Sequence, residues 1–214
     1  MDRGYIYLNK KSFLHNLEVL KNLSRKELCL VVKANAYGHG LEWAVKNAKE
    51  SGIKWFAVAS VDEGVQVKKA YEESRVLLLA EPSKIQLENI KENDIDLTVY
   101  NESFIDTLIE TGNEYSVHLK IDTGMHRLGC PPEKFYDLYK KIVDSDLNLI
   151  GICTHFPMAD TDETETKKSI ELFEKTISDI DSTNMLLHVD NSASTLYKLD
   201  NSFNMARVGI AAYG

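Results

Sequence analysis

A lysine closes the first long apolar run of the sequence, and a glycine-bearing segment follows it directly. Residues 28–32 form the run, and Lys33 is followed by Ala-Asn-Ala-Tyr-Gly-His-Gly. Burying an ammonium group is costly unless the amine is used, for instance as an imine with a carbonyl cofactor. The glycines permit tight turns and close approach to a ligand, although Gly-X-Gly by itself is weak evidence. A lysine that extends to solvent at the edge of a sheet is the alternative interpretation.

A second candidate segment follows the fifth apolar run. Lys120, Asp122 and Arg127 surround a glycine turn at Gly124. The guanidinium group of arginine offers a planar pair of donors that matches a carboxylate, so the segment predicts an anion site. A loop held together by its own salt bridges explains the same residues, and the sequence leaves both interpretations open.

Three further polar segments each accompany an apolar run. Thr-His155-Phe places an imidazole that can act as a base, a ligand or a stacking ring, although a hydrogen-bonded core histidine is the commoner case. Asn191 and Ser192 lead into a short predicted helix, so that a hydroxyl and free backbone N–H groups would face the same side. Arg207 and Gly209 stand in the last apolar run.

The elements that must position these residues alternate between short apolar runs and longer amphipathic segments. Several of the apolar runs are rich in Val, Ile and aromatic residues, which is typical of strands buried on both faces. Strands alternating with helices predict right-handed crossover units and a parallel sheet. Eight strands in about 180 residues favour a closed (β/α)8 TIM-type barrel. The predicted strands are 28–32, 55–59, 76–79, 96–99, 117–121, 149–153, 185–188 and 205–210.

The N-terminal end adds two elements to this barrel. Residues 12–23 form a predicted helix, which could fill the place of a helix following the eighth strand. Residues 5–8 form one more short predicted strand, which would lie outside the barrel. Further along the chain, capping side chains precede three apolar faces and mark helix starts. These predicted starts are Ser60, Asn101 and the segment 160–163.

A barrel of this class carries its chemistry at the carboxyl ends of its strands and commonly binds phosphate at the loops after strands 7 and 8. Ser192, Gly209 and Ile210 together predict such a phosphate cradle. Lys33 would stand opposite, at the end of strand 1. An amine facing a phosphate site suits a phosphorylated aldehyde, and pyridoxal 5′-phosphate is the obvious cofactor.

Composition limits the class of protein. The 214 residues include 25 Lys and Arg against 33 Asp and Glu, a formal net charge of −8. This acidic balance without a basic cluster argues against nucleic acid or an anionic membrane surface as partner. No apolar run approaches the ~20 residues that span a bilayer, and the N-terminus lacks a signal-peptide core. Because Cys29, Cys130 and Cys153 are scattered without metal-ligand spacing, we expect reduced thiols, no metal site and a cytoplasmic protein.

Five of these segments, in this order, resemble the motifs of one protein family. From about residue 3 to the last residue, the chain resembles the N-terminal barrel domain of bacterial alanine racemases. The matching segments are Val-Val-Lys33-Ala-Asn-Ala-Tyr37-Gly-His-Gly, Lys120-Ile-Asp-Thr-Gly-Met-His-Arg127-Leu-Gly, Thr-His155-Phe, His188-x-x-Asn-Ser192-Ala and Arg207-x-Gly209-Ile-x-x-Tyr213-Gly.

The resemblance implies roles for individual residues. Lys33 would hold pyridoxal 5′-phosphate covalently and then serve as one of two acid/base groups. Arg207 would face the pyridine nitrogen, and His155 would stack near the ring and hydrogen-bond to Arg207. Arg127 would contact the phenolic oxygen of the cofactor and orient the substrate. Lys120 matches a position that carries a carbamate in many family members, where the added carboxylate steadies the neighbouring arginine.

The same resemblance implies the remaining cofactor contacts. Tyr37, Ser192, Gly209 and Ile210 would bind the phosphate group, with Asn191 beside them. The cofactor would therefore lie between the end of strand 1 and the loops after strands 7 and 8.

The implied activity is the interconversion of L- and D-alanine, which supplies D-alanine for cell-wall peptidoglycan. Alanine racemases continue into a β-rich C-terminal domain that supplies the second base across a homodimer. Residues 1–214 would then be the barrel domain without it, and poorly active alone. The alternatives are a serine racemase of the same family and a non-catalytic, single-domain protein that binds pyridoxal 5′-phosphate and manages its supply.

Overall fold

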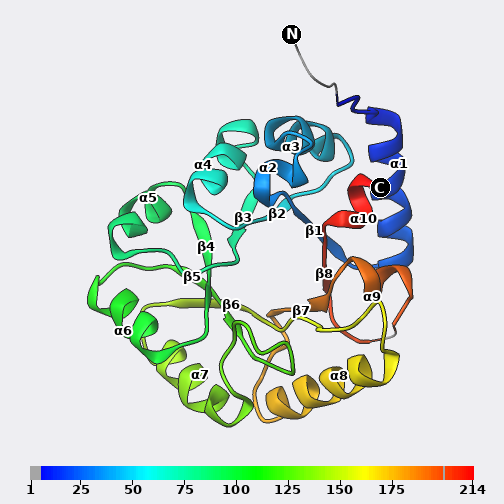
Figure 1. The fold of residues 1–214 in the computed structure, drawn as a ribbon. Helices are drawn as coiled ribbons and strands as arrows, with labels where there is room; N and C mark the ends of the chain where they lie inside the picture. Colours follow the sequence, from blue (N-terminus) through cyan, green and yellow to red (C-terminus); the bar gives the residue numbers. More distant parts are fainter. Residues whose placement is uncertain (1–5, 200) are drawn as a thin grey trace.

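Eight parallel strands close into a barrel in the computed structural model of the protein, which describes residues 6–199 and 201–214 (Figure 1). Each strand pairs with the next along the chain, and β8 closes the barrel by pairing with β1. The predicted (β/α)8 TIM-type architecture is confirmed. The strands are β1 (Glu27–Val31), β2 (Trp55–Val58), β3 (Arg75–Leu78), β4 (Ile95–Val99), β5 (Ser116–Lys120), β6 (Asn148–Cys153), β7 (Leu186–Asp190) and β8 (Met205–Val208).

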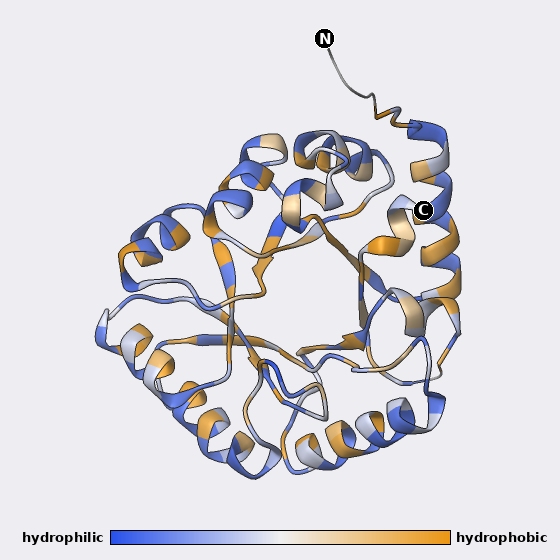
Figure 2. Cartoon of the chain, viewed as in Figure 1, coloured by the Kyte–Doolittle hydropathy of each residue, from blue (hydrophilic) through white to orange (hydrophobic). Residues whose placement is uncertain are grey.

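Helices form a ring around the strands. Figure 2 shows that hydrophobic residues predominate in the strands, whereas the surrounding helices alternate between hydrophilic and hydrophobic residues. This alternation is what a helix needs to cover a buried sheet and face solvent. The helices are α1 (Lys10–Ser24), α2 (Lys33–Tyr37), α3 (Leu41–Glu50), α4 (Val61–Ala70), α5 (Leu87–Glu92), α6 (Glu102–Glu110), α7 (Phe135–Val143), α8 (Glu163–Ile177), α9 (Ser192–Leu196) and α10 (Ile210–Tyr213).

Helix α1 covers the seam where the last strand meets the first. It packs against α9 and α10 and lies beside α10 in Figure 1. Phe13, Leu17 and Leu20 are its buried residues. The predicted N-terminal helix is therefore confirmed, both in position and in the gap that it fills, and it begins two residues earlier than residue 12.

Two of the three predicted helix starts are confirmed by their capping contacts. The Ser60 hydroxyl accepts a hydrogen bond from the Glu63 backbone N–H at 3.3 Å, and the Asn101 side chain accepts one from Phe104 at 2.8 Å. The start predicted within 160–163 falls near the end of that segment. There the capping residue is Asp162, whose carboxylate accepts a hydrogen bond from the Glu165 N–H at 2.9 Å.

The predicted strand over residues 5–8 is not found in the part of the chain that the structure describes. Residue 5 lies outside that part, and residues 6–9 have no regular secondary structure. Ile6 and Tyr7 are 75% and 90% exposed. A strand needs an unpaired edge to bind, and a closed barrel presents none, so an apolar pattern alone does not make a strand here.

The last two strands end at different residues from those predicted. Strand β7 continues to Asp190, whose buried carboxylate forms an ion pair with Lys26 at 2.6 Å and accepts a hydrogen bond from Asn201 at 3.1 Å. Strand β8 ends at Val208, because Gly209 begins the turn into α10. Asn191 and Gly209, which directly follow these two strand ends, both line the cavity described below.

The inside of the barrel is partly apolar and partly polar. Apolar side chains pack in one cluster, and buried polar groups lie on four neighbouring or facing strands. The apolar cluster contains Cys29, Val31, Trp55, Ala57, Leu77 and Met205, and the polar groups are Asp96, Thr98, His118, Lys120, His188 and Arg207. All three cysteines are buried and unpaired, as expected. None of the described helices is both long and apolar enough to cross a lipid bilayer.

Candidate active site

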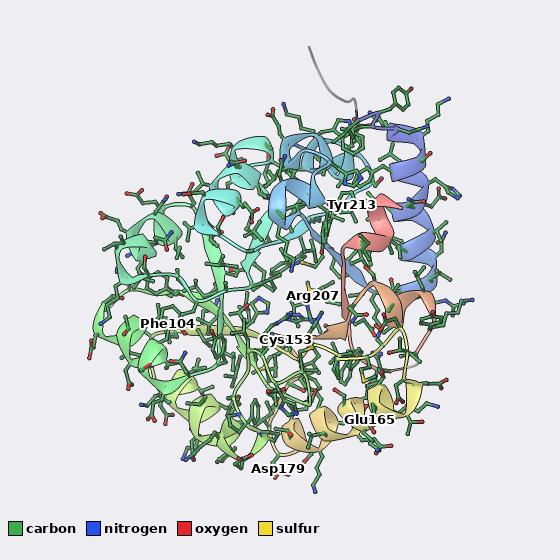
Figure 3. The ribbon with its side chains drawn as sticks, viewed as in Figure 1. Phe104, Cys153, Glu165, Asp179, Arg207 and Tyr213 are labelled. Atoms are coloured by element: carbon green, nitrogen blue, oxygen red, sulfur yellow. The ribbon has the colours of Figure 1, made fainter. Side chains whose placement is uncertain are left out.

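A cavity of about 490 Å³ opens at the carboxyl ends of the strands. Figure 3 shows Arg207 and Cys153, two of its lining residues, near the centre of the barrel. A separate cavity of about 530 Å³, between the start of α8 and the end of α9, contains none of the predicted site residues. All ten predicted residues line the first cavity: Lys33, Tyr37, Lys120, Arg127, His155, Asn191, Ser192, Arg207, Gly209 and Ile210.

The segment after β1 is a turn of left-handed helix. Residues 34–37 all have φ values of 52–53°. Such backbone costs roughly 1–2 kcal/mol for each non-glycine residue, so other contacts must hold it. Asn35 supplies two of them: its carbonyl accepts a hydrogen bond from Gly40 at 3.0 Å, and its side chain accepts one from Leu41 at 2.8 Å, at the start of α3. The strained turn places both Lys33 and Tyr37 on the cavity.

A polar cradle lies between α9 and α10, opposite Lys33. The Ser192 hydroxyl accepts hydrogen bonds from the backbone N–H groups of Gly209 at 2.9 Å and Ala211 at 3.4 Å. A Cβ atom at Gly209 would lie 2.4 Å from the Tyr37 hydroxyl oxygen, so only glycine leaves space between the two. Asn191 caps α9 by accepting a hydrogen bond from Ser194 at 3.1 Å, which makes it a support of the cradle.

Tyr37 is held in place by an aromatic cluster. The Tyr213 ring lies 5.5 Å from the Tyr37 ring and stacks on His39 at 4.8 Å and on Phe13 at 5.6 Å. The Tyr213 hydroxyl donates a hydrogen bond to the Val31 carbonyl at 3.0 Å, at the end of β1. Figure 3 places Tyr213 beside α10 and α1. The sequence marked Tyr213 only as part of a motif, and the structure gives it this supporting place.

Arg207 is fixed by acceptors on two sides. Its Nη1 donates to Nδ1 and to the carbonyl oxygen of His188, both at 2.6 Å. Its Nη2 donates to the Thr154 carbonyl oxygen and, at 3.4 Å, to His155 Nδ1. The predicted contact between His155 and Arg207 is therefore present in the structure. Within the described residues these bonds use the four terminal N–H groups, and Nε–H is the one without a partner.

Two further groups in the cavity have unusual electrostatics. Burial, and then the positive charge of Arg207, lower the pKa of His155 to about 3. The imidazole is therefore neutral at physiological pH and can accept the hydrogen bond from Arg207. Burial also lowers the pKa of Lys120, and the charges of Arg207 and Arg127 act in the same direction. A larger neutral fraction makes the Lys120 amine more nucleophilic.

The loop that carries Arg127 is tied down by its own residues. One oxygen of Asp122 accepts hydrogen bonds from the backbone N–H groups of Gly124 and His126, each at 3.0 Å. A Cβ atom at Gly129 would lie 2.6 Å from the Asp122 nitrogen, so the loop needs glycine there. Arg127 itself is exposed and makes no hydrogen bond to any described residue. Asp122 thus holds the loop through backbone hydrogen bonds and forms no ion pair with Lys120 or Arg127 in the described structure, so Arg127 remains available to a ligand.

A family model for the alanine racemase N-terminal domain matches residues 8–214. The chain belongs to this family. An alanine racemase of Treponema denticola is 37% identical over 210 residues, which cover 92% of this chain and 55% of that protein. An alanine racemase of Fusobacterium nucleatum is 31% identical, over 99% of this chain and 61% of that protein.

Solved structures of the family have the same fold. The alanine racemase from E. faecalis has a TM-score of 0.90 at 29% identity, covering 97% of this chain and 58% of that one. A histidine racemase from Leuconostoc mesenteroides has a TM-score of 0.88 at 25% identity, covering 96% of this chain and 57% of that one. The chain therefore spans a little over half the length of the racemases that it matches.

The racemase family binds pyridoxal 5′-phosphate, and the residues present fit that group. Because Gly209 has no Cβ, the Tyr37 hydroxyl packs closely against it, and the Ser192 hydroxyl accepts a hydrogen bond from its N–H. Two hydroxyl groups that suit a phosphate therefore line the cavity beside Gly209. Lys33 lines the same cavity and would hold the aldehyde end. Arg207 lines the cavity as well, and its Nε–H, which has no partner among the described residues, would donate to an acceptor on the ring.

The sequence marks one of the supporting residues but not the others. His188 stands at a fixed spacing before Asn191 in a motif, which could have marked it as a partner of the site. Asn35 and His118 stand in ordinary positions, and only the closed barrel brings them to their partners.

Proposed function

We propose that the chain is the cofactor-binding barrel of a pyridoxal-phosphate-dependent racemase that interconverts L- and D-alanine. The observation that carries the proposal is that Lys33, the Ser192–Gly209 cradle and Arg207 line one cavity. The Nε–H of Arg207 has no hydrogen-bond partner among the described residues. The relatives named as alanine racemases support alanine as the substrate.

Pyridoxal 5′-phosphate, when bound, supplies an electron-withdrawing ring that stabilises the charge left on Cα as its proton departs. Lys33 would attach the aldehyde carbon through Nζ. Once the substrate amine has displaced it, Lys33 would move a proton to or from Cα on the face that it occupies. Tyr37, Ser192 and the N–H of Ile210 would hold the phosphate and keep the reacting carbon at a fixed place.

Arg207 would set how strongly the ring withdraws electrons. A guanidinium group does not give up its proton in proteins. Its Nε–H would therefore donate to the pyridine nitrogen and leave that nitrogen unprotonated, so that the ring would be a moderate electron sink. This bias favours rapid return of a proton to Cα over the slower side reaction of transamination, which is the bias a racemase needs.

Racemisation also needs a proton donor on the opposite face of Cα. Lys33 serves one face only, and the lowered pKa of His155 makes it a poor proton donor near neutral pH. We therefore place the second acid/base group outside these residues, on a domain contributed by a partner copy in a homodimer. Arg127, exposed at the rim, would orient the substrate between the two groups.

Lys120 would carry a carbamate. The buried amine has a lowered pKa and lines the same cavity as Arg127. The neutral amine would form an N–C bond to carbon dioxide and release one of its protons to solvent, which gives a carboxylate that can pair with that guanidinium. Mass analysis of the intact protein under carbon dioxide, with Lys120→Arg as the control that cannot react, tests this assignment.

Two other functions remain open to the same experiments. The histidine racemase among the related structures makes the substrate side chain a point to test, and serine is a third candidate. A non-catalytic protein that binds pyridoxal 5′-phosphate would share the cradle and Lys33. Such a protein would not turn over an amino acid, so a turnover assay distinguishes it from a racemase.

The first test is attachment of the cofactor. The chain is mixed with pyridoxal 5′-phosphate, reduced with borohydride and digested, and the added mass is expected on the peptide that contains Lys33. Lys33→Ala should lose the label, whereas Lys46→Ala, on the exposed side of α3, should keep it. Labelling that persists in Lys33→Ala would contradict the proposal.

The second test is turnover. Formation of the D-isomer is measured with alanine, serine and histidine in parallel, for residues 1–214 and for the longest polypeptide that the gene encodes. Without the second acid/base group, residues 1–214 should be slower by ~10²–10⁴. Equal rates would place the second base within these residues, and no turnover of any amino acid by either form would favour the non-catalytic alternative.

A further inference from the structure

A buried chain of imidazoles continues from Arg207 into the barrel. His188 Nδ1 accepts a hydrogen bond from Arg207 Nη1 at 2.6 Å, and His188 Nε2 lies 2.8 Å from Nδ1 of His118. Both histidine side chains are fully buried, and their rings are nearly perpendicular, at 80°, with centroids 4.9 Å apart. The chain therefore joins β8 to β5 across β7.

The hydrogen bonds fix where each proton lies. Arginine can only donate, so His188 Nδ1 must be unprotonated and its proton must be on Nε2. That N–H can only donate to His118, so His118 Nδ1 is also unprotonated and its proton is on Nε2, a buried atom without a hydrogen-bond partner among the described residues. A positive charge on either ring would set two N–H groups against each other. Both histidines are therefore neutral, and both carry the same tautomer.

The surroundings act in the same direction. The charged groups that face the pair are Arg75 on β3, Lys120 on β5 and Arg207 on β8, while Asp96 on β4 is occupied by Arg75 at 2.9 Å. Burial and the positive charges of Arg75 and Arg207 lower the pKa of His118 to about 3.

The neighbouring strand leaves room for the His118 ring. Gly151 on β6 is the register partner of His118, and a Cβ atom there would lie 2.3 Å from His118 Nδ1. The edge of the ring also meets Trp55 in a perpendicular contact at 5.7 Å. The position of the atom that accepts the His188 proton is thus determined by packing on two sides.

A neutral partner has a chemical consequence for Arg207. Buried arginines usually pair with carboxylates, which compensate the positive charge. Among the described residues, the partners of Arg207 are two backbone carbonyls and two neutral imidazoles. They orient the guanidinium plane and leave its charge uncompensated, and an uncompensated charge is what opposes protonation of a nearby ring nitrogen.

We infer that His118 is a positioning residue: it fixes the tautomer of His188, and so holds Arg207 with its free N–H toward the ring nitrogen of the cofactor. This inference rests on the proposed function for the identity of the ring. The tautomers themselves do not depend on it, because they follow from the hydrogen bonds of the protein alone.

Two variants of His118 separate positioning from packing. His118→Leu removes the acceptor at similar volume. His118→Asn keeps an acceptor oxygen close to the position of Nδ1 and should rescue the wild-type properties. ¹⁵N NMR of histidine-labelled protein reports the tautomer of each ring, and titration of the same samples with pyridoxal 5′-phosphate reports the dissociation constant.

In the wild type, His118 and His188 should both show the neutral Nε2–H pattern between pH 5 and pH 8. In His118→Leu, His188 should lose its single tautomer, and the dissociation constant should rise roughly tenfold because a buried donor is left without an acceptor. In His118→Asn, His188 should regain its single tautomer, and the dissociation constant should return to within about twofold of the wild-type value.

Three results would overturn the inference: a Nδ1–H or charged pattern for either histidine in the wild type, an unchanged His188 signal in His118→Leu, or equal behaviour of the Leu and Asn variants. If His118→Leu does not fold, the wild-type tautomers and the Asn variant still decide. Failure of the proposed function is distinguishable, since it would remove the label at Lys33 and leave the tautomers as assigned.

Discussion

The two sides of the cavity differ in how completely this chain builds them. On the side of β1, β7 and β8, three polar residues that line the cavity are held by other parts of the chain: Tyr37 by aromatic rings, Ser192 by backbone donors and Arg207 by four acceptors. On the side of β5, Arg127 is exposed and without a partner among the described residues. The first side is arranged before a ligand arrives, and the second depends on what binds there.

This difference matches the division of labour in the proposed function. The cofactor would bind to the preformed side, where rigid contacts fix a phosphate and a ring nitrogen. The substrate would enter at the open side, where Arg127 would gain its partners from the substrate and from a second domain. Each prediction below compares a change on one side with its counterpart on the other.

The largest effect is expected at Gly209. Replacing it with alanine puts a Cβ atom 2.4 Å from the Tyr37 hydroxyl oxygen, so the Tyr37 ring must move from its place beside Ser192. Because overpacking typically costs about 1–3 kcal/mol, affinity for pyridoxal 5′-phosphate should fall roughly 5- to 150-fold, measured by absorbance titration. Gly112→Ala, at the end of α6 where nothing lies within 4 Å, is the control for a simple loss of stability. Unchanged affinity in Gly209→Ala would mean that the phosphate binds elsewhere.

Much of this preformed side was predictable, because its signals are local. Periodicity and chain length gave the eight strands and the ring of helices, and Lys33, Ser192 and Gly209 were marked by their place at strand ends. The left-handed turn at 34–37 was not predictable, since alanine and tyrosine give no hint of a positive φ. The contact between His118 and His188 joins residues 70 positions apart and exists only once the barrel has closed.

The strand predicted over residues 5–8 illustrates the opposite error, in which a local pattern predicts an element that does not form. An apolar alternation over residues 5–8 satisfies the local rule for a strand, and the described part of that segment nevertheless stays exposed. A local pattern states what a segment can form, and the partner decides whether it does.

Acid should weaken the preformed side selectively. Burial lowers the pKa of His118 to about 3, well below its value near 6.5 in an unfolded chain. Between these values the unfolded state binds more protons, so the stability that depends on neutral His118 is complete above pH 6.5 and is lost as the pH falls toward 3. Each such histidine should change the unfolding equilibrium constant about tenfold per pH unit in this window.

Urea unfolding between pH 7 and pH 4.5 measures the slope. His118→Asn should lower the slope of the unfolding free energy against pH by the equivalent of one proton. The contributions of Asp96 and the other titrating groups cancel when the slopes of the two proteins are subtracted. His126→Asn is the matched control on the open side, because it removes a histidine whose side chain is 85% exposed. Equal slopes for the wild type and His118→Asn would show that His118 is already protonated in the folded protein.

A smaller effect is expected at Tyr213. Its hydroxyl donates to the Val31 carbonyl, two residues before Lys33, and its ring supports Tyr37. Tyr213→Phe keeps the ring and removes one partly buried hydrogen bond, which is worth about 0.5–1.5 kcal/mol. Most of this loss should appear as lower stability, with affinity for pyridoxal 5′-phosphate falling about two- to fivefold. Tyr213→Leu, which also removes the ring, should weaken binding further, and the reverse order would exclude the aromatic cluster as the support of Tyr37.

The smallest effect on cofactor affinity is expected at Arg127, and it is the sharpest test of the contrast between the two sides. The side chain is exposed, makes no hydrogen bond to the described residues, and stands on a loop that Asp122 and Gly129 hold without its help. Arg127→Ala in residues 1–214 should therefore change the affinity for pyridoxal 5′-phosphate by less than about twofold, since an exposed charge contributes little.

In the longest polypeptide that the gene encodes, the same substitution should raise KM for the amino acid and lower kcat/KM by about tenfold or more, because the desolvated guanidinium would then lose a charged hydrogen bond to the substrate. Arg127→Lys keeps the charge without the planar fork and should recover only part of this loss. A tenfold loss of cofactor affinity in the short chain would show that Arg127 already holds the cofactor, and the open side would then be as fully built by this chain as the other.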